Sequence, residues 1–242
     1  METMKKTLRV LVCGAAGRMG RAVAAEIASS PAFELAGRVG SAPAAGIEPP
    51  SAFAGLLASA DVAVDFSVPA AACAYAAACA RARKPFVTGT TGFSGGQLAA
   101  LKAAARRTAV FFSPNMSPAV NLCFSLAALA AERLQGFDAH VHEAHHSAKK
   151  DVPSGTALRF GSAIASARGG KVPPITSARA GDIVGDHAVL FAGPHERVEL
   201  KHMAHSRAVF AAGALKAAAW TAGLRPGFYD YFDLLGVGKP GK

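Results

Sequence analysis

Short apolar runs alternate with alanine-rich stretches along the first half of the chain. Runs rich in valine, leucine and phenylalanine predict strands, and the longer stretches between them predict helices. The predicted strands are residues 8–13, 33–39, 61–67, 85–93 (which runs into a turn) and 108–112. Repeated alternation of strands with helical stretches predicts a parallel, doubly wound α/β sheet.

The pattern changes after residue 117, where strands and helices no longer alternate regularly. The elements predicted there are a long helix at 120–134, a strand at 137–142, a helix at 156–166, strands at 189–192 and 197–202, a helix at 208–220 and a closing segment at 228–235. Residues 171–180 contain prolines and are predicted to form a connection.

A glycine-rich turn joins the first predicted strand to the first predicted helix. Its residues are Gly14, Ala15, Ala16, Gly17, Arg18, Met19 and Gly20. In a strand–turn–helix context, such glycines let the backbone approach a pyrophosphate at the N-terminus of the helix. A plain tight turn is the alternative for the glycine pattern taken alone. Its position directly after a strand favours dinucleotide binding.

Composition excludes several classes of protein. With 242 residues and 51% hydrophobic content, the chain is long enough for one large or two modest domains. No apolar run is long enough to span a bilayer, and the first residues lack a signal-peptide core, so we expect a soluble cytoplasmic protein. None of the four cysteines forms a CxxC pair, so we expect free thiols and no metal site.

The chain is basic, with a formal net charge of +10. Binding to nucleic acid is one interpretation of this charge. However, the basic residues are scattered and aromatic residues are not interleaved with them, so we expect no nucleic-acid partner. A positive field also attracts anionic cofactors and substrates, and we prefer this interpretation.

Residues 143–157 combine several groups that suit acid–base chemistry on an anion. His145 and His146 can move a proton near neutral pH, and Lys149 supplies a positive charge. Gly155 and Thr156 follow a Pro-Ser turn that opens a helix, where backbone N–H groups bind anions. This combination predicts a site for a small acidic substrate that gains a proton. The alternative is a solvated basic loop followed by an ordinary helix cap.

The same stretch resembles the signature of the dihydrodipicolinate reductase family, Glu-x-His-His-x-x-Lys-x-Asp-x-Pro-Ser-Gly-Thr-Ala. Every fixed position of the signature is present here. The glycine turn at 14–20 and the Gly-Thr-Thr-Gly-Phe turn at 89–93 are also similar to those of the family. The resemblance covers essentially the whole chain, although the segments near 46–59 and 170–183 are shorter than in the family.

The resemblance implies an NAD(P)H-dependent oxidoreductase that reduces dihydrodipicolinate, a small dicarboxylate, to tetrahydrodipicolinate in the diaminopimelate route of lysine biosynthesis. It implies a Rossmann-type dinucleotide-binding domain made of residues 1–117 and 209–242. It further implies an inserted mixed α+β domain, residues 118–208, that binds the substrate and builds a homotetramer.

The resemblance also implies roles for individual residues. His145 is then the general acid with Lys149 as an assisting proton donor, and His146, Lys149, Gly155 and Thr156 hold substrate carboxylate. Asp151 is expected to orient the loop. The implied cofactor-binding residues are those of the glycine turn together with Gly40, Ser41, Phe66, Gly89, Thr90, Thr91, Ser113, Pro114, Asn115 and Met116.

Residue 40 bears on the choice between NADH and NADPH. A carboxylate near the end of the second strand commonly holds the ribose diol of NAD, but Gly40 stands at that position, followed by Ser41. Arg38 and Ser41 are candidates to contact a 2′-phosphate. Both NADH and NADPH are therefore expected to serve.

Two other functions are compatible with a Rossmann fold. One is a non-catalytic NAD(P)-binding regulator or scaffold, against which the intact signature argues. The other is a different small-acid dehydrogenase, for which no other catalytic set is recognisable. His140 and His142 are expected on a strand surface. His187, His195, His202 and His205 belong to no motif, although strands of the second domain could bring one of them near the site.

Overall fold

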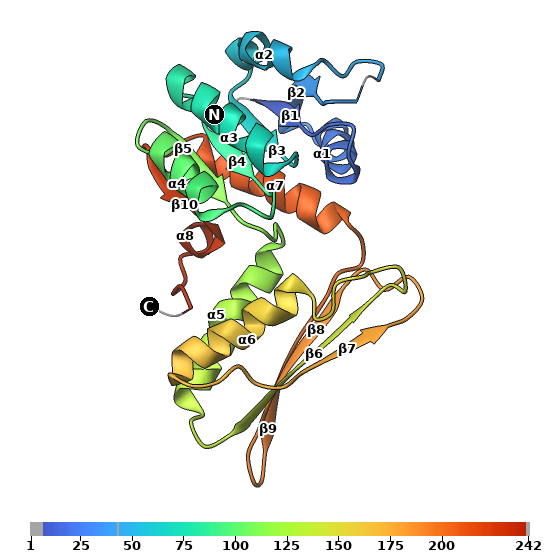
Figure 1. Ribbon diagram of the computed structural model, residues 1–242, viewed down its shortest axis with the longest axis vertical. Helices are drawn as coiled ribbons and strands as arrows, with labels where there is room; N and C mark the ends of the chain where they lie inside the picture. Colours follow the sequence, from blue (N-terminus) through green and yellow to red (C-terminus); the bar gives the residue numbers. More distant parts are fainter. Residues whose placement is uncertain (1–6, 43, 241–242) are drawn as a thin grey trace, which may run out of the picture. The chain divides into compact units, whose positions relative to one another are not determined.

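The computed structural model describes residues 7–42 and 44–240, which divide into two compact units (Figure 1). Of the described residues, unit 1 comprises those up to Met116 together with Ala208–Leu234, and unit 2 comprises Ser117–Arg207 and residues 235–240. In this division the residues from Leu235 group with unit 2, whereas the sequence analysis assigns all of 209–242 to the first domain. The hydroxyl of Ser125 donates to the carbonyl of Gly238 at 2.8 Å, which holds the C-terminal segment on unit 2.

Unit 1 is built on a parallel sheet of six strands in the order β10-β5-β4-β3-β1-β2. Its strands are β1 (Leu8–Cys13), β2 (Phe33–Val39), β3 (Val62–Asp65), β4 (Phe86–Thr88), β5 (Ala109–Phe112) and β10 (Gly227–Tyr229). All residues of β3 and β4 are buried, as expected for central parallel strands that helices cover on both faces. The predicted doubly wound sheet is confirmed.

Helices cover both faces of this sheet. The helices of unit 1 are α1 (Arg18–Ala28), the short 3-10 helix η1 (Pro50–Ala52), α2 (Phe53–Ser59), α3 (Pro69–Ala82), α4 (Gly95–Ala104), α7 (Ala208–Thr221) and α8 (Tyr231–Leu235). Leu11 and Cys13 of β1 pack in one core cluster with residues of α2, α3 and α4. Helices α1 and α7 pack against each other, and α7 lies on β3, β4 and β5 (Figure 1).

Unit 2 has a second sheet, in the order β7-β6-β8-β9. Its strands are β6 (Asp138–His145), β7 (Ile175–Arg179), β8 (Asp186–Ala192) and β9 (Arg197–Met203). Strand β7 runs parallel to β6, whereas the other pairs are antiparallel, so the sheet is mixed. Helices α5 (Pro118–Arg133) and α6 (Gly155–Arg168) pack against each other, with the rings of Phe124 and Phe160 4.5 Å apart.

Two predictions about unit 2 were wrong, and both corrections bear on function. Residues 171–180 contain strand β7, which begins directly after Pro173 and Pro174. Proline has no N–H to donate, but at the start of an edge strand it does not interrupt the hydrogen bonds between strands. Strand β6 continues beyond residue 142 to His145, because β7 pairs with it as far as His145 and β8 as far as Ala144. The first residues of the signature therefore lie on a paired strand.

No helix within residues 7–42 and 44–240 combines the length and the apolar character needed to cross a membrane.

Candidate active site

The turn between β1 and α1 requires glycine for steric reasons. Gly14 has a φ of +72°, and a Cβ there would lie 2.3 Å from the carbonyl oxygen of Phe66. A Cβ at Gly20 would lie 2.2 Å from the carbonyl oxygen of Gly14. Helix α1 has Gly17 at its N-cap, with no side-chain cap and no acidic residue in its first turn. Its N-terminal N–H groups are thus suited to an anionic ligand.

Asp65, at the end of β3, organises the next loops of unit 1. The buried carboxylate accepts hydrogen bonds from the hydroxyls of Ser67, Thr88 and Thr90. Burial raises the pKa of this carboxyl, and the hydrogen bonds offset only part of that effect. The predicted cofactor residue Thr90 is therefore fixed by a buried carboxylate, and the close contact of Gly89 with the ring of Phe66 leaves no room for a side chain at residue 89.

The loop after β5 is also fixed from within unit 1. The hydroxyl of Ser113 donates to the carbonyl of Asn115 at 2.7 Å, and the hydroxyl of Tyr231 donates to the carbonyl of Met116 at 2.8 Å. Every predicted cofactor residue follows the carboxyl end of one of the parallel strands β1 to β5. The structure therefore brings all of them to one edge of the sheet, the edge at which such sheets bind ligands.

The segment after β2 shows how Gly40 and Arg38 are used. Gly40 is buried and donates its N–H to the carbonyl of Glu48 at 3.0 Å, whereas Ser41 is exposed. The guanidinium of Arg38 donates to the carbonyls of Gly46 and Ala45. Arg38 thus holds its own loop, and at least two of its donors are already engaged.

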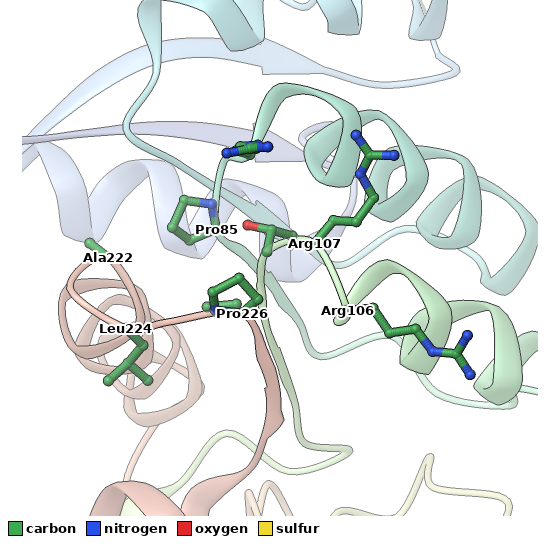
Figure 2. Close-up of a pocket in the computed structure, with 9 residues that line it drawn as sticks. Pro85, Arg106, Arg107, Ala222, Leu224 and Pro226 are labelled. Carbon is green, nitrogen blue, oxygen red and sulfur yellow. The ribbon is translucent and has the colours of Figure 1, made fainter.

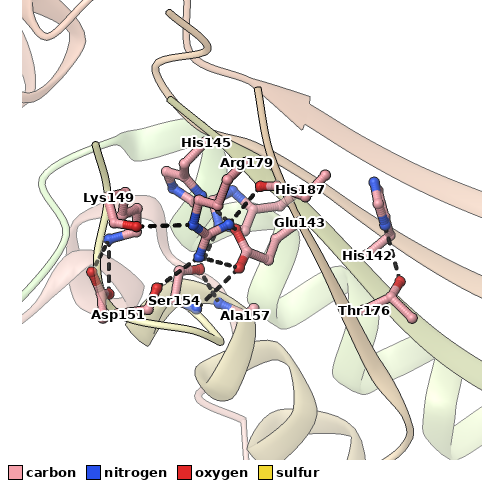
Figure 3. A network of polar contacts seen from close by, with 11 residues as sticks. His142, Glu143, His145, Lys149, Asp151, Ser154, Ala157, Thr176, Arg179 and His187 are labelled. Carbon is pink, nitrogen blue, oxygen red and sulfur yellow. Dashed lines mark hydrogen bonds and ion pairs between the residues drawn. The ribbon is translucent and has the colours of Figure 1, made fainter. Parts of the chain in front are cut away.

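In unit 2, Glu143 is the centre of a polar network at the end of β6 (Figure 3). Its side chain is 0% exposed. It accepts two hydrogen bonds from the guanidinium of Arg179, at 2.8 and 3.0 Å, and one from the backbone N–H of Ser154 at 3.3 Å. Its other neighbour is Nδ1 of His145, with which it forms a short hydrogen bond. A proton on Nδ1 leaves Nε2 of His145 as the nitrogen available for proton exchange.

Burial and neighbouring charges shift the pKa values of Glu143 and His145. Burial alone would raise the pKa of Glu143, but the hydrogen bonds from Arg179 and His145 lower it to about 2, so this residue is a carboxylate. Burial lowers the pKa of His145, and Lys149 and Arg179 lower it further, while Glu143 opposes the shift. The network therefore holds an imidazole that readily gives up a proton.

Lys149 and Asp151 form an ion pair on the loop that follows β6. The ammonium of Lys149 lies 2.7 and 2.8 Å from the two carboxylate oxygens of Asp151. That Asp151 orients the loop stays a prediction. His146 is the residue after β6 and is half-buried.

Helix α6 presents the predicted anion site at its N-terminus. Ser154 is the N-cap, and its hydroxyl accepts from the N–H of Ala157. Gly155 and Thr156 are the first two residues of the helix, and a Cβ at Gly155 would meet nothing within 4 Å. Backbone N–H groups at the start of a helix suit a carboxylate, and Gly155 adds no side chain there.

Two residues of this region belong to no motif in the sequence. Arg179, the last residue of β7, bonds Glu143 and lies in the segment predicted to be a connection. His187 of β8 lies with its ring centre 5.2 Å from that of His145, and its Nε2 is 3.2 Å from the hydroxyl of Ser154. Residues 175–179 carry little hydrophobic periodicity, so the sequence offered no clear local signal for Arg179.

A cavity of about 560 Å³ in unit 1 lies elsewhere (Figure 2). It is lined by residues that include Arg83, Arg107, Thr108 and Pro226. Arg83 lies between α3 and β4, Arg107 and Thr108 lie directly before β5, and Pro226 lies directly before β10. The cavity is therefore at the amino edge of the sheet, opposite to the glycine turns, and it is not the candidate cofactor site.

A glycine turn on a parallel sheet, together with a loop that carries two histidines and a lysine in unit 2, is typical of a Rossmann-type, NAD(P)H-dependent oxidoreductase. Two family profiles match the chain: "Dihydrodipicolinate reductase, N-terminus" over residues 8–116 and "Dihydrodipicolinate reductase, C-terminus" over residues 119–235. The chain belongs to the dihydrodipicolinate reductase family.

Relatives are similar over nearly their whole length. The 4-hydroxy-tetrahydrodipicolinate reductase of Thiobacillus denitrificans is 44% identical, over 96% of this chain and 99% of the relative. That of Laribacter hongkongensis is 41% identical, over 95% and 98%. A dipicolinate-bound dihydrodipicolinate reductase from Paenisporosarcina sp. TG-14 has a TM-score of 0.81 at 22% identity, covers 95% of this chain and 100% of that chain, and shows the same fold.

Proposed function

We propose that the chain is a 4-hydroxy-tetrahydrodipicolinate reductase of lysine biosynthesis, which forms tetrahydrodipicolinate with a hydride from NADPH or NADH. The observation that carries the proposal is the arrangement of the signature in unit 2, where Glu143 links His145 to the N-terminus of α6. A proton donor and an anion site are thereby built into one rigid frame, which suits reduction of an anionic ring.

The residues of unit 1 fit a nicotinamide dinucleotide. The positive φ of Gly14 and the absence of a side-chain cap on α1 leave backbone N–H groups for a pyrophosphate. The cofactor, when bound, supplies the hydride. The loops that contain Phe66, Thr90 and Met116 would hold its other parts, because they lie at the same edge of the sheet.

The residues of unit 2 take the roles of substrate binding and proton transfer. His146, Lys149 and the N–H and hydroxyl groups of Gly155 and Thr156 hold a carboxylate of the substrate. His145 donates a proton from Nε2 to the substrate atom that gains negative charge, and Lys149 assists. The substrate is a small dicarboxylate, to which the cationic loop is complementary. Unit 1 is then the dinucleotide-binding domain and unit 2 the substrate domain, through which we propose that the chain forms a homotetramer.

The cofactor preference follows from residue 40. Gly40 offers no carboxylate to bind a ribose diol or to repel a 2′-phosphate, and the basic chain favours an additional phosphate. Both cofactors are then used, with NADPH at least equal to NADH in kcat/KM.

One assay tests the activity. Oxidation of NADPH and of NADH is followed with and without the product of dihydrodipicolinate synthase. The proposal requires oxidation that depends on this product. A chain that binds the cofactor tightly but oxidises none when the product is added would instead be the NAD(P)-binding regulator.

A further inference from the structure

Arg179 contacts three residues of the catalytic region at once, one on β6 and two on the loop that follows it. Its guanidinium binds both carboxylate oxygens of Glu143, at 3.0 and 2.8 Å. The same group donates to the carbonyl of Lys149 at 3.3 Å and to the carbonyl of Asp151 at 2.6 Å (Figure 3). The side chain of Arg179 is only 16% exposed, so these contacts are largely shielded from water.

Glu143, which Arg179 holds, in turn contacts His145 and the N-terminus of α6. One oxygen of its carboxylate is bound to Nδ1 of His145, and the other accepts the backbone N–H of Ser154, the N-cap of α6. The orientation of the imidazole and the position of the helix N-terminus therefore depend on one buried carboxylate. Arg179 is the cation that compensates its charge.

We propose that Arg179 is a positioning residue for reduction of the substrate. Through Glu143 it fixes the orientation and tautomer of His145, and through two backbone carbonyls it fixes the loop that carries Lys149. The inference rests on the proposed function, because it assigns no chemistry of its own to Arg179.

The geometry requires arginine at this position and not merely a positive charge. Contacts of this kind use the planar fork of a guanidinium, with two donors on the carboxylate and the remaining donors on carbonyls. The single ammonium of lysine can neutralise Glu143 but cannot reach all of these acceptors together. Arg179→Lys therefore separates charge from geometry, and Arg179→Ala removes both and leaves space for a guanidinium ion.

Arg168 provides a matched control within unit 2. Its guanidinium also donates to backbone carbonyls, those of Ala131 and Leu134, at 3.2 and 2.9 Å. These contacts join α6 to the end of α5 and involve no residue of the catalytic loop. Arg168→Ala thus reports what the loss of a structural arginine does to activity.

The experiment measures kcat, KM for each substrate and the pH profile of kcat for the wild type, Arg179→Ala, Arg179→Lys and Arg168→Ala. For Arg179→Ala we expect kcat/KM to fall about 10–100-fold, the usual effect of losing a group that orients a catalytic histidine. KM for the dicarboxylate should rise while KM for the cofactor stays unchanged. Added guanidinium should restore part of kcat in a saturable manner, and equal concentrations of sodium chloride should not.

The pH profile distinguishes positioning from simple loss of stability. The charged or titratable groups around His145 are Glu143, Lys149, Asp151, Arg179 and the neighbouring His187. Arg179→Ala removes a positive charge from this set, so the limb of the profile that reports His145 should move to higher pH. Arg179→Lys keeps the charge and should lower kcat with little movement of the limb.

Three results would overturn the inference. The first is a folded Arg179→Ala or Arg179→Lys variant with wild-type kcat/KM. The second is a loss that guanidinium does not reverse and that Arg168→Ala reproduces. If Arg179→Ala does not fold, Arg179→Lys alone decides. The third, a wild type without product-dependent oxidation, would overturn the proposed function as well, whereas the first two leave that function intact.

Discussion

His187 should make the protein sensitive to mild acid. The side chain is 6% exposed, its Nε2 contacts the hydroxyl of Ser154, and its Nδ1 has no hydrogen-bond partner within the described part of the chain. Burial lowers the pKa of His187 from 6.5 to about 3, and nearby His145 and His202 add to this shift. The folded protein therefore keeps His187 neutral under conditions in which an unfolded chain protonates it.

The sign and size of the effect follow from proton linkage. Between pH 6.5 and about 3 the unfolded state binds a proton at His187 that the folded state does not, so stability falls as the pH falls. Where the unfolded state binds one proton more than the folded state, the free energy of unfolding falls by about 1.4 kcal/mol for each pH unit. Lowering the pH from about 8 to about 5 crosses roughly 1.5 units below the unfolded pKa, which removes about 2 kcal/mol of the free energy of unfolding.

His187→Gln removes the titration while an amide can keep the contact with Ser154. Urea unfolding at about pH 8, 7, 6 and 5 and at one protein concentration gives the free energy of unfolding for both proteins. The wild type should lose about 2 kcal/mol more than His187→Gln over this range. His142→Gln, at an exposed position on β6, controls for the loss of a strand histidine. Parallel curves for the wild type and His187→Gln would refute the reasoning.

Three other predictions concern catalysis. His145→Gln should lower kcat by about 10²–10⁴-fold and leave cofactor binding, followed by nicotinamide fluorescence, unchanged; wild-type turnover would remove His145 from the mechanism. Lys149→Ala and Thr156→Val should raise KM for the dicarboxylate, and Lys149→Ala should also lower kcat; a rise in the KM of the cofactor instead would mean that the loop binds another ligand. Gly40→Asp should shift the kcat/KM ratio towards NADH. Because a Cβ at residue 40 would lie 3.0 Å from Ile47, it is best tested with Ile47→Ala, and Ile47→Ala alone is the control. An unmoved ratio would show that residue 40 does not select the cofactor.

Five of the six strands of unit 1 could be predicted because each of them carries its own signal, whereas β10 lies where only a closing segment was predicted. The runs that became β1 and β2 are bounded by turn residues, and the structure keeps the predicted limits of both strands. Parallel strands covered on both faces are continuously apolar, so the signal does not depend on which partner each strand finds. The tight contacts of Gly14 and Gly20 explain why the turn after β1 was recognisable.

The network of unit 2 could be predicted only in part, because its partners come from distant segments. Glu143, His145 and Ser154 were visible within one signature, but the role of Glu143 depends on the pairing of β6 with β7. Arg179 is 36 residues from Glu143, and His187 is 33 residues from Ser154. Strand β7 is a short edge strand of small and polar residues after two prolines, which gives little hydrophobic periodicity to detect.

The two ion pairs of the catalytic loop differ in how readily they can be exchanged. Lys149 pairs with Asp151, whose side chain is largely exposed, and such a pair contributes only about 0–1 kcal/mol. A substrate carboxylate can therefore replace Asp151 at Lys149 at little cost. The pair between Glu143 and Arg179 is buried, and breaking such a pair costs about 3–5 kcal/mol. The catalytic region thus combines Lys149, which can change partners, with the fixed pair of Glu143 and Arg179. It is this fixed pair that orients His145.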